Sequence, residues 1–152
     1  MKTNLSKRMS VVTGFVIFFG VFNILYTLLE AKSGIDYGRW DEEWYVWKVL
    51  ILSGCILFGI AINVLAMVFM LHSVKLIKRG EFFSKFNAYT LWWSAPICFL
   101  YNLSIANLPI INGYPRIIIL KADTFLVPLL LIGVAMIYSA GVRLSEENRL
   151  TV

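Results

Sequence analysis

Acidic and basic side chains are scarce in this 152-residue chain. Only 15% of its residues are charged, 59% are apolar, and the mean hydropathy is +0.76. A soluble domain has about 25% charged and about 45–50% apolar residues. This balance excludes a disordered tail, a nucleic-acid-binding domain and an ordinary soluble enzyme. We therefore expect a small membrane protein whose main partner is the lipid bilayer, with no direct contact to nucleic acid.

Groups that support catalysis or metal binding are also few. The chain has one histidine, His72, and two cysteines, Cys55 and Cys98, which lie in apolar stretches without a C-x-x-C motif. A zinc site needs about four ligands, and no Cys, Asp or Glu stands at ligand spacing from His72. The sequence therefore predicts a non-enzymatic protein without cofactor or metal, inert thiols and a surface histidine. Proton- or ion-coupled transport is disfavoured, because the long apolar stretches contain no Asp, Glu, Lys, Arg or His at their centres.

Four long uncharged runs make up more than half of the sequence. They cover residues 9–29, 49–71, 88–108 and 124–142, and about 20 apolar residues suffice to cross a bilayer. The first run exceeds the 7–15 residues of a signal-peptide core, so we expect a retained span. The sequence predicts an all-α fold: an integral membrane bundle of four transmembrane helices, in a single domain over residues 1–152.

The distribution of basic residues predicts the orientation. Loops facing the cytoplasm carry an excess of Lys and Arg, and placing the N-terminus inside puts nine of the fourteen basic residues there. We therefore expect a multi-pass membrane protein with both termini on the cytoplasmic side. The nine inner residues would be Lys2, Lys7, Arg8, Lys75, Lys78, Arg79, Lys85, Arg143 and Arg149.

The outer connections contain turn residues and aromatic residues. Residues 34–38 predict a turn, after which the acids at 41–43 would open the second helix, where the helix dipole favours them. Trp40, Trp44 and Trp47 are spaced to share one helix face as interfacial anchors, with a cation-binding cage as the alternative. Pro109 and the Asn-Gly turn at 112–113 predict that the chain breaks its helix on the outer side. Residues 116–121 predict either a short strand or an interfacial segment.

An eight-residue pattern occurs twice, 61 residues apart. Residues 80–87 and 141–148 both read G-x-x-(F/L)-S-x-x-N. In each copy we expect the glycine to end a helix and the serine to start a new turn, with Ser84 capping the third helix and Pro96 kinking it. The repetition fits two repeated helix-pair halves, or two independent helix ends with the same capping chemistry.

Four amides lie within or at the ends of the predicted spans. Each needs a hydrogen-bond partner in hydrocarbon, so all four should face the interior of the bundle. They either join helices, with those at positions 63 and 102 the strongest candidates, or, in the case of those at 102 and 107, line a ligand cleft that opens outward. The four are Asn23, Asn63, Asn102 and Asn107.

The segment 78–87 and the tail 141–152, which ends in Leu-Thr-Val, resemble a bacterial family catalogued as domain of unknown function 2975, whose members are small four-span membrane proteins. In place of that family's proline and acid, this chain has Glu81 and Phe86. The resemblance implies a multi-pass protein of the bacterial inner (cytoplasmic) membrane. It also implies a cytoplasmic protein partner, such as a small helix-turn-helix regulator, and no catalytic residues.

The leading functional hypothesis is a non-enzymatic membrane module whose inner loop and tail bind that regulator. The alternatives are a small-molecule transport, pore or immunity protein and a four-span enzyme of the glutathione-transferase type, and a homo-oligomer remains open. The basic loop and acidic tail would also be able to pair with each other, while simple attraction to anionic lipid is the competing explanation. The predicted partner-binding residues are Lys75, Lys78, Arg79, Phe82, Phe83, Asn87, Glu146 and Glu147.

Overall fold

Four long α-helices and one short 3-10 helix make up the structure, a computed structural model that describes residues 2–38, 40, 44–113 and 118–150. No strand occurs in these ranges, which confirms the all-α prediction. The elements follow one another as α1 (Lys2–Tyr37), α2 (Tyr45–Arg79), α3 (Lys85–Ala106), η1 (Leu108–Asn112) and α4 (Ala122–Leu150).

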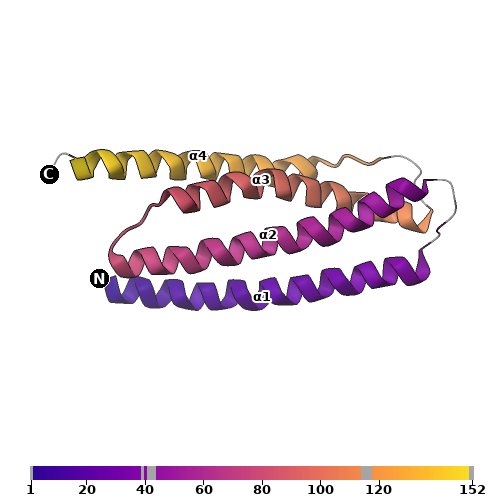
Figure 1. Cartoon of the computed structure of the whole chain (residues 1–152), viewed down its shortest axis with the longest axis horizontal. Helices are drawn as coiled ribbons and strands as arrows, with labels where there is room; N and C mark the ends of the chain where they lie inside the picture. Colours follow the sequence, from indigo (N-terminus) through magenta and orange to yellow (C-terminus); the bar gives the residue numbers. More distant parts are fainter. Residues whose placement is uncertain (1, 39, 41–43, 114–117, 151–152) are drawn as a thin grey trace.

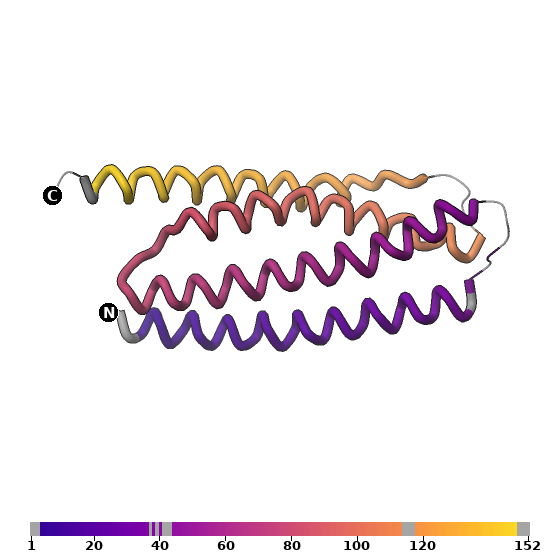
Figure 2. The backbone as a smooth tube through the Cα atoms, viewed as in Figure 1, coloured from indigo at the N-terminus to yellow at the C-terminus, as the bar shows by residue number. Residues whose placement is uncertain are grey.

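The helices pack side by side in chain order. α1 packs on α2, α2 on α3 and α3 on α4, and η1 fills the space beside the first three (Figure 1). Within the described ranges, the backbones of α1 and α4 nowhere approach within 8 Å of each other. The assembly is therefore an open row in which α1 and α4 form the two edges. Both described ends of the chain and the α2–α3 loop lie at one end of the row (Figure 2).

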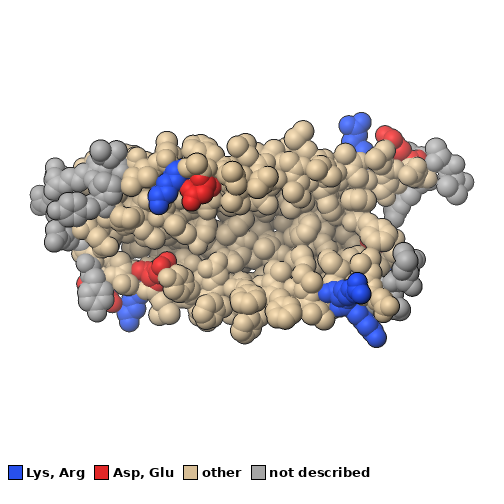
Figure 3. All heavy atoms as spheres, turned by 180° about the vertical axis from the view of Figure 1, so that it is seen from behind, with Lys and Arg blue, Asp and Glu red and all other residues tan. Residues whose placement is uncertain are grey.

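All four helices are long and apolar enough to cross a membrane. Charged side chains gather towards the two ends of the face seen in Figure 3, with an uncharged band between them. Many large apolar side chains on α1 and α4 are exposed, including Phe18 at 65% and Ile137 at 76%. Such a band is typical of surfaces that a bilayer covers, because hydrocarbon accepts apolar side chains and excludes charges.

Two predictions about the first connection are wrong. The turn at residues 34–38 is absent, because α1 continues to Tyr37 and the Gly38 amide still donates to the Gly34 carbonyl at 3.0 Å. Gly38 instead lets η1 approach, since a Cβ on it would lie 2.7 Å from Cγ2 of Ile111. The tryptophans do not share a helix face, because α2 begins only at Tyr45. The acids at 41–43 lie outside the described residues.

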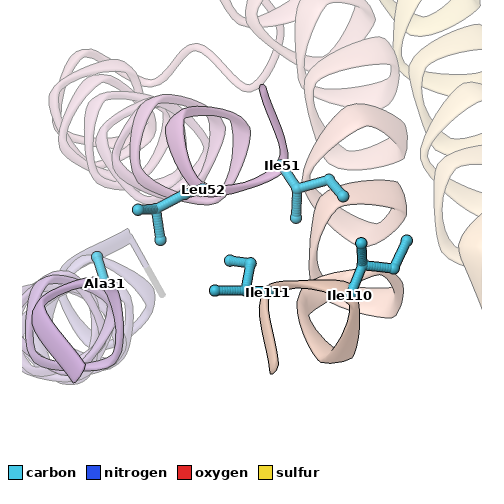
Figure 4. Packing of buried hydrophobic residues seen from close by; sticks show 5 residues of the cluster. All are labelled: Ala31, Ile51, Leu52, Ile110 and Ile111. Carbon is cyan, nitrogen blue, oxygen red and sulfur yellow. The ribbon is translucent and has the colours of Figure 1, made fainter. Parts of the chain in front are cut away.

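Near this connection, a small apolar cluster joins three elements. Ala31 of α1, Ile51 and Leu52 of α2, and Ile110 and Ile111 of η1 point towards one another (Figure 4). Their exposed fractions lie between 1% and 9%. Trp40 and Trp44 pack against the cluster, so these two aromatic rings help to build the core. Trp47 is 48% exposed and remains available as an interfacial anchor.

Candidate functional site

The loop between α2 and α3 has a defined conformation. Gly80 has φ 82°, and its amide donates to the carbonyls of Leu76 and Ile77, which ends α2. The Ser84 hydroxyl accepts from the amide of Asn87 at 3.1 Å and caps α3. Both predictions are confirmed. The glycine supplies the left-handed conformation and the serine satisfies one free amide, so the loop reverses direction in few residues.

A buried asparagine beneath this loop joins three helices. The exposed fraction of Asn87 is 0%. Its amide nitrogen donates to the Ser73 hydroxyl at 2.8 Å and to the Tyr138 hydroxyl at 3.3 Å. Nδ1 of His72 lies 2.8 Å from its amide oxygen. Asn87 therefore connects α2, α3 and α4 through side chains alone, and its burial keeps it from direct contact with a partner.

The hydroxyl groups fix the direction of these bonds. Ser73 donates its own hydrogen to the Phe69 carbonyl at 2.7 Å, and Tyr138 donates to the Phe82 carbonyl at 3.1 Å. Both hydroxyl oxygens must therefore accept from the Asn87 amide nitrogen, which turns the amide oxygen towards His72. His72 accordingly carries a hydrogen on Nδ1. The prediction of a surface histidine is wrong: His72 is half-buried and lies against the ring of Phe86, with the centroids 4.8 Å apart.

The tail of α4 packs directly on the loop. The rings of Phe83 and Tyr138 meet edge to face, with their centroids 5.2 Å apart. Phe83 also covers Gly141, where a Cβ would lie only 2.5 Å from the Phe83 ring. Nζ of Lys85 lies 2.9 Å from Oε1 of Glu146. The loop and tail thus form one surface, with the basic-to-acidic contact that the two sequence segments predicted.

A groove of about 480 Å³ lies between the loop and the tail. Two matched positions of the first copy of the repeated pattern, Gly80 and Phe83, line the groove. All four matched positions of the second copy also line it. The lining residues are Gly80, Glu81, Phe82, Phe83, Gly141, Leu144, Ser145 and Asn148. We call this concavity the loop–tail groove. Its lining combines large apolar side chains with polar ones, as do surfaces that receive a side chain from a partner.

The second copy of the pattern does not cap a helix. α4 continues through Gly141 and Ser145 to Leu150, so the prediction of a second helix end is wrong. Gly141 is not among the residues with positive φ. It serves a packing purpose, because only a residue without a side chain leaves room for Phe83. The two copies therefore have different local structures and meet at the same groove.

Most predicted partner-binding side chains are exposed around the groove. Phe82 is 57% exposed and Phe83 is 41% exposed. Glu146 and Glu147 lie on the tail beside the lining residue Ser145, and the basic residues lie at the end of α2. All of the following are exposed: Lys75, Lys78, Arg79, Phe82, Phe83, Glu146 and Glu147.

The four amides of the spans have different partners. Asn23 donates to Oδ1 of Asn63 at 3.4 Å across the α1–α2 contact, as expected for a bond between helices. Asn102 donates to the Asp123 carbonyl at 3.5 Å and lines a hollow of about 210 Å³ at the opposite end. Asn107 is 2% exposed, and its amide pairs with both backbone groups of Ile119. The hollow beside Asn102 has the position of the predicted outward cleft, but Asn107 is not part of it.

The sequence did not point to Ser73 or Tyr138, which complete the bonds around Asn87.

No described group of His, Cys, Asp and Glu residues has the arrangement of a metal site. Residues 116–117, the start of the segment predicted as strand or interfacial, lie outside the described ranges. Residues 118–121 have no regular secondary structure. Pro96 lies within α3, which runs through it without a break.

Comparison with known proteins adds no relative. No protein-family model, no curated protein and no solved structure matches the chain. The resemblance to the four-span family therefore stays a prediction. The fold itself defines the class: an all-α chain with four helices that are able to span a membrane.

Proposed function

We propose that this chain is a non-enzymatic multi-pass protein of the bacterial cytoplasmic membrane that docks a cytoplasmic protein at its loop–tail groove. The proposal rests on the groove itself. Two segments 61 residues apart in sequence are held together there by a buried hydrogen-bond network, a ring packed on a glycine and an ion pair. A connection that only links two spans does not need this degree of order.

The surface around the groove indicates the chemistry of the partner. Phe82 and Leu144 are both large, apolar and more than half exposed, and they flank a concavity that fits an apolar side chain. Basic residues stand on the α2 side and acidic residues on the α4 side. We infer a partner with an amphipathic helix, whose apolar face enters the groove and whose flanks carry both charges. A small helix-turn-helix regulator, as the family resemblance implies, meets this description.

The groove can be tested with two matched variants. Leu144→Glu places a charge in the groove wall at a residue that is already 60% exposed, so the fold should tolerate it. Arg143→Glu introduces the same side chain one residue away, outside the groove lining. A photocrosslinker at position 82 in native membranes should capture a cytoplasmic protein. We expect Leu144→Glu to abolish this capture and Arg143→Glu to preserve it.

Two outcomes would overturn the proposal. Crosslinks to lipid alone would show that Phe82 is an interfacial anchor. Equal capture by Leu144→Glu and by the wild type would show that the partner does not use the groove.

A further inference from the structure

The side-chain amide of Asn23 has hydrogen-bonding groups that no described residue uses. Its Nδ2 donates to Oδ1 of Asn63 at 3.4 Å, and Nδ2 of Asn63 donates to the Gly59 carbonyl at 2.7 Å. An amide has two N–H donors and one carbonyl oxygen. Among the residues that the structure describes, the second N–H and the Oδ1 of Asn23 therefore have no hydrogen-bond partner. Asn23 lies inside the uncharged run 9–29, where a bilayer offers no water as a substitute.

Asn23 lines a groove between α1 and α2, which we call the α1–α2 groove. Its volume is about 560 Å³, and its two asparagines stand among apolar residues. An acyl chain in this groove offers no hydrogen bond, and a polar group without a partner is unfavourable in hydrocarbon. The amide therefore favours an occupant that has both a donor and an acceptor. The lining residues are Val12, Phe15, Val16, Phe19, Gly20, Phe22, Asn23, Asn63 and Ala66.

The α1 side of the groove has the spacing of a helix-pairing surface. Its lining residues recur at intervals of four, three and four, which is the spacing of the a and d positions in a coiled coil. An asparagine at one such position fixes the register and the number of helices in a coiled coil. A second series with the same spacing is aromatic and ends at Tyr26. The two series are Val12, Val16, Phe19, Asn23 and Phe15, Phe19, Phe22, Tyr26.

The two edges of the helix row differ in their polar groups. In the run 124–142 of α4, the polar side chains are Thr124, Tyr138 and Ser139. Thr124 is 1% exposed, and the two other hydroxyls donate to the carbonyls of Phe82 and Ala135. The α4 edge is therefore suited to lipid, whereas the α1 edge presents an amide that still lacks partners.

The aromatic side chains beside the groove supply much of the area that an interface needs. Phe15, Phe19, Phe22 and Tyr26 are between 52% and 63% exposed. At about 200 Å² per aromatic residue, their exposed parts come to about 450 Å² per copy, more than half of the roughly 800 Å² that each partner gives to a standard interface. The exposed residue Ala66 on the α2 side adds to this area.

We propose that a second copy of this chain occupies the α1–α2 groove, with Asn23 of each copy bonded to Asn23 of the other. Two copies in one membrane have the same orientation, so a twofold axis along the membrane normal relates them and equal positions meet at equal depth. The free N–H of each Asn23 donates to the free Oδ1 of the other. α1 of each copy lies in the groove of the other, and the four helices form a bundle. The proposal rests on the membrane assignment above but not on the docked cytoplasmic partner.

Cysteine crosslinking in native membranes tests the geometry with two adjacent residues. Phe19 lines the groove and is 60% exposed, whereas Phe18 is 65% exposed and lies outside the lining. The full chain with only its buried native cysteines is the blank. Neighbouring residues point about 100° apart on a helix, so a mild oxidant should join Phe19→Cys into a covalent dimer and join Phe18→Cys roughly fivefold less.

A second experiment tests the amide pair in the full chain purified in detergent, with the dimer dissociation constant measured by sedimentation equilibrium. Asn23→Leu removes both hydrogen bonds between the copies and should raise this constant about tenfold. Asn63→Leu is the control, because it removes the same bond between α1 and α2 but leaves Asn23 free to pair. We expect Asn63→Leu to change the constant less than about threefold.

Three outcomes would overturn the proposal: monomers at every protein concentration, equal crosslinking at positions 18 and 19, or a dimer of Asn23→Leu that is as tight as the wild type. Crosslinks from position 19 to a different protein would also overturn it, because they would assign the groove to another membrane helix. Leu144→Glu should leave the crosslink at position 19 unchanged, so failure of the dimer is distinguishable from failure of the docked partner.

Discussion

The two ends of the helix row each contain one buried asparagine, and the two asparagines bond to different kinds of group. Asn87 at the loop–tail end bonds to the side chains of His72, Ser73 and Tyr138. Asn107 at the opposite end bonds to the backbone of Ile119 and Leu103.

The different partners indicate different roles: Asn87 positions helices, and Asn107 closes the opposite end of the fold. The side-chain partners of Asn87 on α2 and α4 position these two helices relative to α3, directly beneath an exposed loop. Backbone partners fasten an irregular segment to the end of α3, close to an apolar cluster. We infer that the loop–tail end is the working surface and that the opposite end mainly closes the fold.

Topology is the broadest test of this comparison, because a working surface for a cytoplasmic partner must face the cytoplasm. Alkaline phosphatase is active only outside the cytoplasmic membrane. We expect fusions after residues 38 and 113 to be active and fusions after residues 80 and 152 to be inactive. Activity at position 80 would reverse the two ends and remove the cytoplasmic partner.

Replacement of Asn87 should have the largest effect on stability. Asn87→Leu leaves polar groups of three neighbours without their partner, and each unsatisfied buried group costs about 1–3 kcal/mol. We expect the free energy of unfolding in detergent to fall by about 3 kcal/mol. Asn102→Leu is the control, with an expected loss of about 0.6 kcal/mol, typical of a single bond between membrane helices. Equal losses would mean that the network does not hold the loop–tail end.

Replacement of Asn107 should destabilise the opposite end without affecting docking. Asn107→Leu removes both bonds to Ile119, and we expect a loss of about 2 kcal/mol. A cysteine introduced at position 119 should then react faster with a thiol reagent, while capture at position 82 stays unchanged. A loss of capture would show that the two ends are coupled.

Gly141 offers a smaller and more local test. Gly141→Leu should displace the Phe83 ring and cost about 1–2 kcal/mol by overpacking. At Gly133, on the same helix, a Cβ would meet nothing within 4 Å. Gly133→Leu should therefore leave the unfolding free energy unchanged. If both variants behave alike, Phe83 does not depend on the space above Gly141.

The ion pair between Lys85 and Glu146 should have the smallest effect. Both side chains are largely exposed, so solvent and salt screen their attraction. We expect Glu146→Lys to leave thermal unfolding unchanged and to weaken partner capture, and Lys85→Glu in the same chain should restore capture. Failure of this charge swap, with both proteins folded, would mean that the tail acid meets the partner rather than the loop.

The sequence predicted those parts of the fold that depend on local chemistry. Apolar runs of membrane length identified all four helices, and Gly80 and Ser84 marked the loop between α2 and α3. The same local rules failed at residues 34–38 and at Gly141, because a glycine that makes room for a neighbour, as Gly38 does for Ile111, looks identical in sequence to a glycine that ends a helix. Only the positions of Ile111 and Phe83 distinguish the two uses.

The candidate site was predicted in composition but not in arrangement. Its exposed charges and phenylalanines were recognisable from their density after the second span. The contribution of Ser73 was not, because a serine hydroxyl in an apolar run is ordinarily satisfied by its own helix. The contribution of Tyr138 was not either, because its hydroxyl bonds to groups 51 and 56 residues away in sequence. Their meeting at Asn87 depends on the packing of three helices, which no short pattern encodes.

The open row has a consequence for synthesis. Since each helix packs mainly on the helix made just before it, every new helix that leaves the ribosome finds its neighbour already in place. Contacts between near segments form quickly, because little chain entropy is lost in closing short loops. The first two helices can therefore insert and pair before the last two exist, and the loop–tail groove is completed only when the end of α4 arrives.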